Sequence, residues 1–121
     1  MIKWLLALAL VCSVYENQQG VMFRIANRSE FELQNVIVKF PSQTEEYGNI
    51  PPMGITNYRQ ISKAYRYAYV HALIDGNEAV LQPEDYVGEE LLKPGRYTYA
   101  FTYNPTAKDK YSRLRLEFER E

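Results

Sequence analysis

Residues 64–76 read AYRYAYVHALIDG, and this stretch decides the fold. Its side chains alternate between two sets, Tyr65, Tyr67, Tyr69, His71 and Leu73 against Arg66, Ala68, Val70, Ala72 and Ile74. A period of two is the pattern of a β-strand. The Asp75-Gly76 pair that follows is the turn signal of a two-residue hairpin leading into residues 77–82. We therefore predict a β-hairpin here.

The two faces of this strand differ in polarity. Burial favours the set that contains alanine, valine and isoleucine, because these side chains have no polar atoms to satisfy. The tyrosines then point outward, and outward tyrosines form a rigid amphipathic surface of the kind that binding sites use. We predict a binding surface of Tyr65, Tyr67 and Tyr69, with Arg59 from the preceding strand at its edge. Two alternatives stay open: the rings only stabilise an exposed sheet face through cross-strand pairs, or the faces are reversed and the tyrosines lie in the core.

The same alternation recurs along the chain between turn signals. In residues 31–40, FELQNVIVKF, the hydrophobic positions change parity, which predicts a β-bulge near Gln34-Asn35. Residues 41–54 are rich in proline and glycine and are expected to form a long loop. One helical turn is expected to start at Pro83. The expected strands are 21–26, 31–40, 55–61, 64–74, 77–82, 96–103 and 112–119.

These patterns predict an all-β fold in one domain, residues 21–121. Seven short antiparallel strands in a chain of this length indicate a single β-sandwich of the immunoglobulin-like or prealbumin-like kind, and a small closed β-barrel is the alternative. The 11 tyrosines agree with this, because tyrosine favours half-buried sheet surfaces.

One segment has a familiar form. Leu92–Tyr99 reads LKPGRYTY and resembles the L-x-P-G-x-Y-T segment that begins a strand in transthyretin-like and carboxypeptidase-regulatory-like sandwiches of secreted proteins. The whole chain is similar to small exported bacterial sandwich proteins of this type. The resemblance implies the sandwich fold and export, and it carries no activity and no binding residue.

The N-terminus predicts export. Lys3 precedes an apolar run from Trp4 to Val11, and we expect residues 1–13 to be a signal peptide and 14–20 a short polar leader. The run falls short of the roughly 20 residues that span a bilayer, so no membrane span is predicted. Lipid attachment at Cys12 is an alternative to cleavage after Ser13, and a buried N-terminal strand or helix is another. The expected location is periplasmic or extracellular, and no second cysteine exists to form a disulfide within the chain.

The chemistry-bearing residues are few. The net charge of −1 and the absence of a recognised motif argue against nucleic acid, and no cofactor is predicted. His71 is the only histidine, and the motif of a serine nucleophile, Gly-x-Ser-x-Gly, does not occur. Residues 83–90, PEDYVGEE, are acidic but lack the spacing of a calcium-binding EF-hand loop, so no metal site is predicted. The basic residues that follow this acidic segment in the sequence could form ion pairs with it, either within the fold or between two molecules.

Three hypotheses for function remain. The first is a non-catalytic exported binding or accessory module, whose tyrosine face contacts a protein or glycan partner. The second is a small hydrolase or carbohydrate-active enzyme that uses His71 and the acidic loop 84–90. The third is a structural subunit that self-assembles as an edge-strand homodimer, with Val21–Ala26 as the candidate edge.

Overall fold

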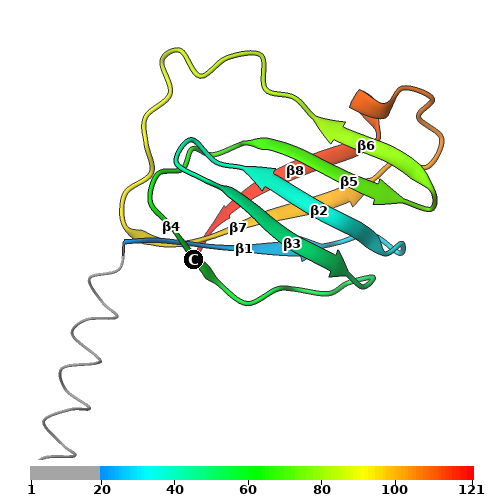
Figure 1. The fold of residues 1–121 in the computed structure, drawn as a ribbon, viewed down its shortest axis with the longest axis horizontal. Helices are drawn as coiled ribbons and strands as arrows, with labels where there is room; N and C mark the ends of the chain where they lie inside the picture. Colours follow the sequence, from blue (N-terminus) through cyan, green and yellow to red (C-terminus); the bar gives the residue numbers. More distant parts are fainter. Residues whose placement is uncertain (1–19) are drawn as a thin grey trace, which may run out of the picture.

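The computed structural model describes residues 20–121, which form two β-sheets packed face to face (Figure 1). The predicted signal peptide, Cys12 and all of the predicted leader except Gly20 lie outside the described residues. Within residues 20–121, no helix is long and apolar enough to cross a membrane.

The described part of the chain contains eight strands and one short 3-10 helix. The strands are β1 (Val21–Asn27), β2 (Leu33–Lys39), β3 (Thr44–Ile50), β4 (Arg59–Ile61), β5 (Tyr69–Ile74), β6 (Asn77–Leu81), β7 (Gly95–Tyr103) and β8 (Leu114–Arg120), and the helix is η1 (Lys110–Ser112). One sheet has the order β4-β1-β7-β8, and the other has the order β3-β2-β5-β6. Since neither sheet closes on itself, the fold is sandwich-like, and the alternative of a closed barrel is wrong.

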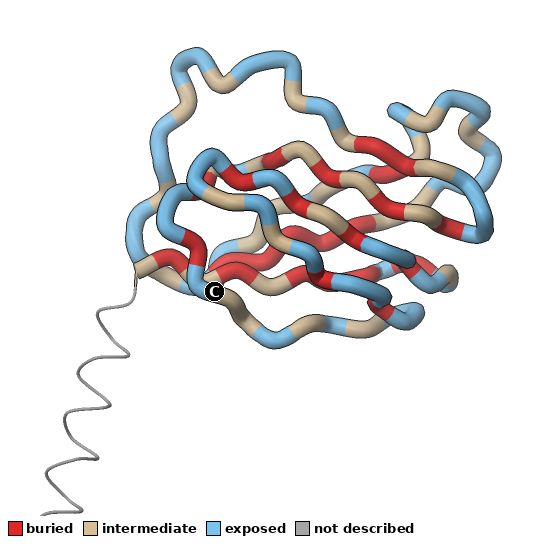
Figure 2. Tube along the Cα trace, in the orientation of Figure 1, coloured by how far each residue is buried: buried red, intermediate tan, exposed pale blue. Residues whose placement is uncertain are grey.

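The core lies between the two sheets (Figure 2). Phe23 of β1 packs on Tyr97 and Tyr99 of β7, with ring centroids 5.5 and 4.4 Å apart. Ala72 of β5 and Ala68, just before that strand, belong to the same buried cluster. Phe40, which follows β2 in the other sheet, contacts Phe23 and Tyr99 with ring centroids 5.3 and 5.9 Å apart, so aromatic side chains fill the space between the sheets.

Two local predictions are confirmed. Asp75 and Gly76 have φ angles of 50° and 76°, and Ile74 pairs with Asn77, as a tight two-residue hairpin requires. In β2 the register shifts between Leu33 and Val36, and Asn35 has a φ of 51°, so the expected bulge is present. The bulge lets Leu33 and Val36 both point into the core.

Three predictions about single elements need correction. The expected loop 41–54 contains strand β3, so there are eight strands in place of seven. The expected strand 55–61 is shortened to β4, with one isolated bridge between Ile55 and Ala26. The segment from Pro83 forms no helical turn; a turn closes later, where the Glu89 amide donates to the Tyr86 carbonyl.

The pairing of β1 overturns two further predictions. This strand runs parallel to β7, from Val21 opposite Gly95 to Asn27 opposite Phe101, so the sheets are not wholly antiparallel. Because β4 pairs with its other side, β1 lies inside the sheet. Val21–Ala26 is therefore not a free edge, and the edge strands are β3, β4, β6 and β8.

Candidate binding face

The outward face of the segment 65–73 carries the predicted tyrosines. Ala68, Val70, Ala72 and Ile74 are all 1% exposed or less, which confirms that the small apolar set is buried. Tyr65, Tyr67 and Tyr69, on the opposite face, are half-buried. The rings thus lie outside the core, but they are partly covered by another part of the chain.

The cover comes from the loop between β6 and β7. Its residue Tyr86 lies between two of the predicted tyrosines and stacks on both. The ring centroids are 4.8 Å apart for Tyr65 and 5.4 Å apart for Tyr67, with interplanar angles of 20° and 9°. The Tyr67 hydroxyl also donates a hydrogen bond of 3.2 Å to the Asp85 carbonyl. Tyr86 was not among the predicted site residues, and its place could not be read from the sequence, because loop residues show no periodicity.

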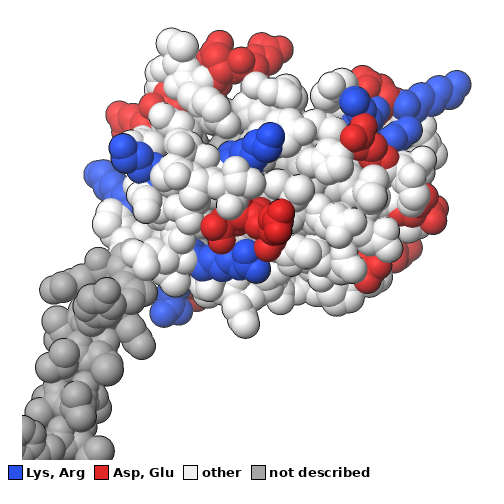
Figure 3. All heavy atoms as spheres, viewed as in Figure 1, with Lys and Arg blue, Asp and Glu red and all other residues white. Residues whose placement is uncertain are grey.

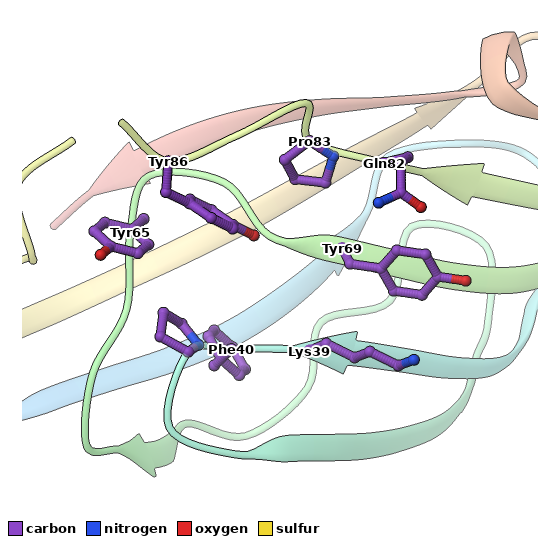
Figure 4. A pocket seen from close by; sticks show the side chains of 8 residues that line it. Lys39, Phe40, Tyr65, Tyr69, Gln82, Pro83 and Tyr86 are labelled. Atoms are coloured by element: carbon purple, nitrogen blue, oxygen red, sulfur yellow. The ribbon is translucent and has the colours of Figure 1, made fainter. Parts of the chain in front are cut away.

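An open hollow lies beside this stack on the outer face of the second sheet (Figure 4). Its volume is about 560 Å³, within the range of about 300–1,000 Å³ typical of small-molecule sites. The lining combines aromatic rings and prolines with one cation and one amide: Lys39, Phe40, Pro41, Tyr65, Tyr69, Gln82, Pro83 and Tyr86. We call this the aromatic hollow.

Lys39 and Tyr69 form its right-hand wall in Figure 4, where their side chains extend side by side from neighbouring strands. The Lys39 ammonium lies 4.7 Å from the centre of the Tyr69 ring, a cation–π contact. The two residues are directly paired between β2 and β5. Gln82 has no hydrogen-bond partner within residues 20–121, so its amide is free to meet a ligand.

The surroundings of the stack raise the pKa of two of its tyrosine hydroxyls. Burial is the main cause that raises the pKa of Tyr86, while a backbone hydrogen bond with Tyr69 acts against it. The pKa of Tyr67 is also raised, by burial first and then by the charge of Glu89. Both phenols therefore stay neutral and act as hydrogen-bonding groups at physiological pH.

The structure separates the four predicted site residues. Tyr65 and Tyr69 line the aromatic hollow, whereas Tyr67 lines a different groove beyond the Tyr86 ring. Arg59 lies elsewhere: its guanidinium sits 4.4 Å from the centre of the Tyr47 ring and donates a 2.8 Å hydrogen bond to the Glu46 carbonyl. Tyr47 and Glu46 belong to β3, which β2 separates from β5.

The groups of the enzyme hypothesis are not brought together. His71 Nε2 lies 2.8 Å from Glu78 Oε2, and the other Glu78 oxygen lies 3.1 Å from Lys110 Nζ. His71 thus contacts the hairpin partner strand and not the acidic loop 84–90. Within the described residues, no group of three or more histidine, cysteine, aspartate or glutamate side chains could hold a metal ion.

Charge is distributed unevenly around this face (Figure 3). Acidic side chains gather along the β6–β7 loop, and acidic and basic side chains lie next to one another near the middle of the face.

Comparison with known proteins gives information about the fold alone. No family model matches the chain, and no curated protein matches it. A protein from Eubacterium rectale, solved by NMR, is similar in structure with a TM-score of 0.55 and 10% sequence identity. The match covers 88% of this chain and 94% of that one, so the likeness extends over the whole sandwich-like domain.

Proposed function

We propose that the chain is a non-catalytic, exported binding module that holds a neutral glycan in the aromatic hollow. The observation that carries the proposal is the hollow itself: Tyr65, Tyr69 and Tyr86 place aromatic rings around an open cavity, and Lys39 and Gln82 place polar groups on its wall. A sugar ring has apolar C–H faces and polar hydroxyl edges. The faces match the tyrosine rings, and the edges match the ammonium and the amide.

Export is part of the proposal and rests on the pattern of residues 1–13. The immunoglobulin-like or prealbumin-like type of the sandwich is also part of it. Its support is the two-sheet packing together with the resemblance of Leu92–Tyr99 to secreted sandwiches.

The test is an NMR titration of the isotope-labelled protein with soluble neutral oligosaccharides of glucose, xylose, mannose and N-acetylglucosamine. We expect one class to shift the amide resonances of Lys39, Tyr69, Gln82 and Tyr86 in a saturable way. If no saccharide shifts them, or if the shifts map to another surface, the glycan ligand is wrong.

The same samples separate binding from catalysis. We expect the oligosaccharides to remain intact during prolonged incubation, as followed by mass spectrometry. Breakdown that a His71→Ala variant abolishes would favour the hydrolase over the binding module.

A further inference from the structure

A second groove lies between the edge strands β6 and β8. One long side of the sandwich, between β3 and β4, is closed by polar contacts, since Arg59 donates to the Glu46 carbonyl and Gln43 donates to the Gln60 carbonyl. Within residues 20–121, the polar contacts across the opposite side lie near η1, where Arg113 donates to the Glu78 carbonyl over 2.7 Å and Lys110 pairs with the Glu78 carboxylate over 3.1 Å. Beyond η1 this side stays open.

This opening, which we call the β6–β8 groove, has a volume of about 500 Å³ and a mainly apolar floor. The lining comes from both sheets: Arg66, Tyr67, Ala68, Leu81, Gln82, Pro83, Leu114, Arg115, Leu116 and Phe118. Leu81, Leu116 and Phe118 are core-facing side chains that the open edge leaves only partly buried. An apolar surface of this kind favours an occupant with its own apolar side chain.

The charges around the groove define that occupant further. Arg66 and Arg115 are the charged residues in its lining, and no carboxylate lines it. Both side chains are exposed, and within residues 20–121 neither guanidinium has a hydrogen-bond, ion-pair or aromatic partner. Two cationic side chains beside an apolar floor are complementary to a peptide segment in which carboxylates flank an apolar residue.

The chain itself carries such a segment. The β6–β7 loop arches away from both sheets (Figure 1), and its residue Val87 is 88% exposed. Glu84 and Glu90 flank Val87, and both are exposed with no partner in the described part of the chain. Tyr86 stacks on both Tyr65 and Tyr67, which anchors the loop to its own chain at this residue and leaves Val87 exposed.

We propose that the β6–β8 groove binds the Glu84–Glu90 loop of a second copy of this chain. Val87 of one copy contacts the apolar floor of the other, and its flanking carboxylates pair with Arg66 and Arg115. The loop leaves directly from the rim of the groove, at Pro83. In a two-fold symmetric pair of copies the same contact forms twice, which closes the dimer.

The test is self-association of the purified chain, measured by sedimentation velocity over a concentration series. Two charge-reversed variants are compared with it: Arg66→Glu/Arg115→Glu in the groove, and Glu84→Lys/Glu90→Lys in the loop. We expect the unmodified chain to dimerise, more weakly at high salt because the ion pairs are screened. Each variant alone should remain monomeric, with unchanged circular dichroism and thermal midpoint.

An equimolar mixture of the two variants gives the sharpest result. The loop variant keeps an intact groove, and the groove variant keeps an intact loop. The two reversed sites also carry opposite charges, so the mixture should form heterodimers through both contacts. A chain that is monomeric at millimolar concentration overturns the proposal. So does dimerisation that survives both variants, or that only the groove variant loses, since the occupant is then another segment. Neither the four substituted residues nor Val87 lines the aromatic hollow. A negative result in this experiment therefore leaves the glycan proposal unaffected.

Discussion

The hydroxyl of Tyr99, deep in the core, donates a hydrogen bond of 2.5 Å to the backbone carbonyl of Tyr65 at the aromatic hollow. The bond runs from β7 in one sheet to the segment that leads into β5 in the other. It fixes the backbone that carries the Tyr65 ring and thereby the stack with Tyr86. Burial raises the pKa of Tyr99, so this phenol remains a donor over the whole physiological range.

Tyr99→Phe should destabilise the protein, because the Tyr65 carbonyl loses its donor inside the fold. The expected loss is about 1–3 kcal/mol of unfolding free energy, measured by urea denaturation. Tyr103→Phe is the matched control: its hydroxyl has no hydrogen-bond partner within residues 20–121, so its loss should be small. Equal effects from the two substitutions would show that the Tyr99–Tyr65 bond contributes nothing.

Asn27→Ala should be more damaging than any surface substitution. Asn27 is 1% exposed, and its amide nitrogen donates to the carbonyls of Phe31, Ile50 and Pro51. Its amide oxygen accepts from Ser29. Removing this side chain leaves several backbone groups without a partner, and we expect a loss of about 3 kcal/mol or more in chemical denaturation. Asn57→Ala, at an exposed site, serves as the comparison and should be nearly neutral.

Gly76→Ala tests the hairpin turn. A Cβ at this position would meet nothing within 4 Å, so any cost comes from the backbone, whose φ of 76° is unfavourable for alanine. We expect a loss of about 1–2 kcal/mol in thermal or urea unfolding. Asp75→Asn keeps a residue that tolerates positive φ and should leave stability unchanged. A neutral Gly76→Ala would contradict the assigned turn.

Acid should destabilise the fold through two exposed glutamates. Hydrogen bonds to His71 and Lys110 lower the pKa of Glu78, and a hydrogen bond from Arg28 lowers that of Glu119. A carboxyl group whose pKa is lower in the folded state stabilises the fold at pH values above its unfolded pKa of about 4.3. That contribution is lost as the pH falls through the folded pKa.

The measurement is the urea midpoint between neutral pH and about pH 3, a window set by the depression of both pKa values below the ordinary one. The Glu78→Gln/Glu119→Gln variant should show a flatter decline than the unmodified chain. Parallel curves would mean that neither ion pair contributes to acid sensitivity.

The sequence was sufficient for features that depend on neighbouring residues. The alternation in residues 64–76 predicted the buried face, and the parity change in 31–40 predicted the bulge at Asn35. Strand β3 was missed because its buried residues, Tyr47 and Ile50, are three apart, and Gly48 between them has a φ of 73°. A polar edge strand with an irregular backbone does not show a period of two.

The remaining errors concern contacts between distant segments. Nothing in the local pattern of β1 indicates that it pairs in parallel with β7, since pairing partners are set by the whole fold. The same holds for Arg59: its place on the chain suggested an edge to the tyrosine face, but the sheet order puts it against β3. Tyr86 joined the site only because the β6–β7 loop brings its ring against those of Tyr65 and Tyr67.

The central claim is tested most directly by the affinity of the aromatic hollow for its glycan. Isothermal titration with the oligosaccharide identified by NMR should show one site, and Tyr69→Ala should weaken binding by about tenfold or more, because Tyr69 offers the hollow a ring that is not stacked on another tyrosine. Tyr111→Ala, which removes a more exposed tyrosine outside the hollow, should bind like the unmodified chain. Equal affinity of the Tyr69→Ala variant and the unmodified chain would contradict the account.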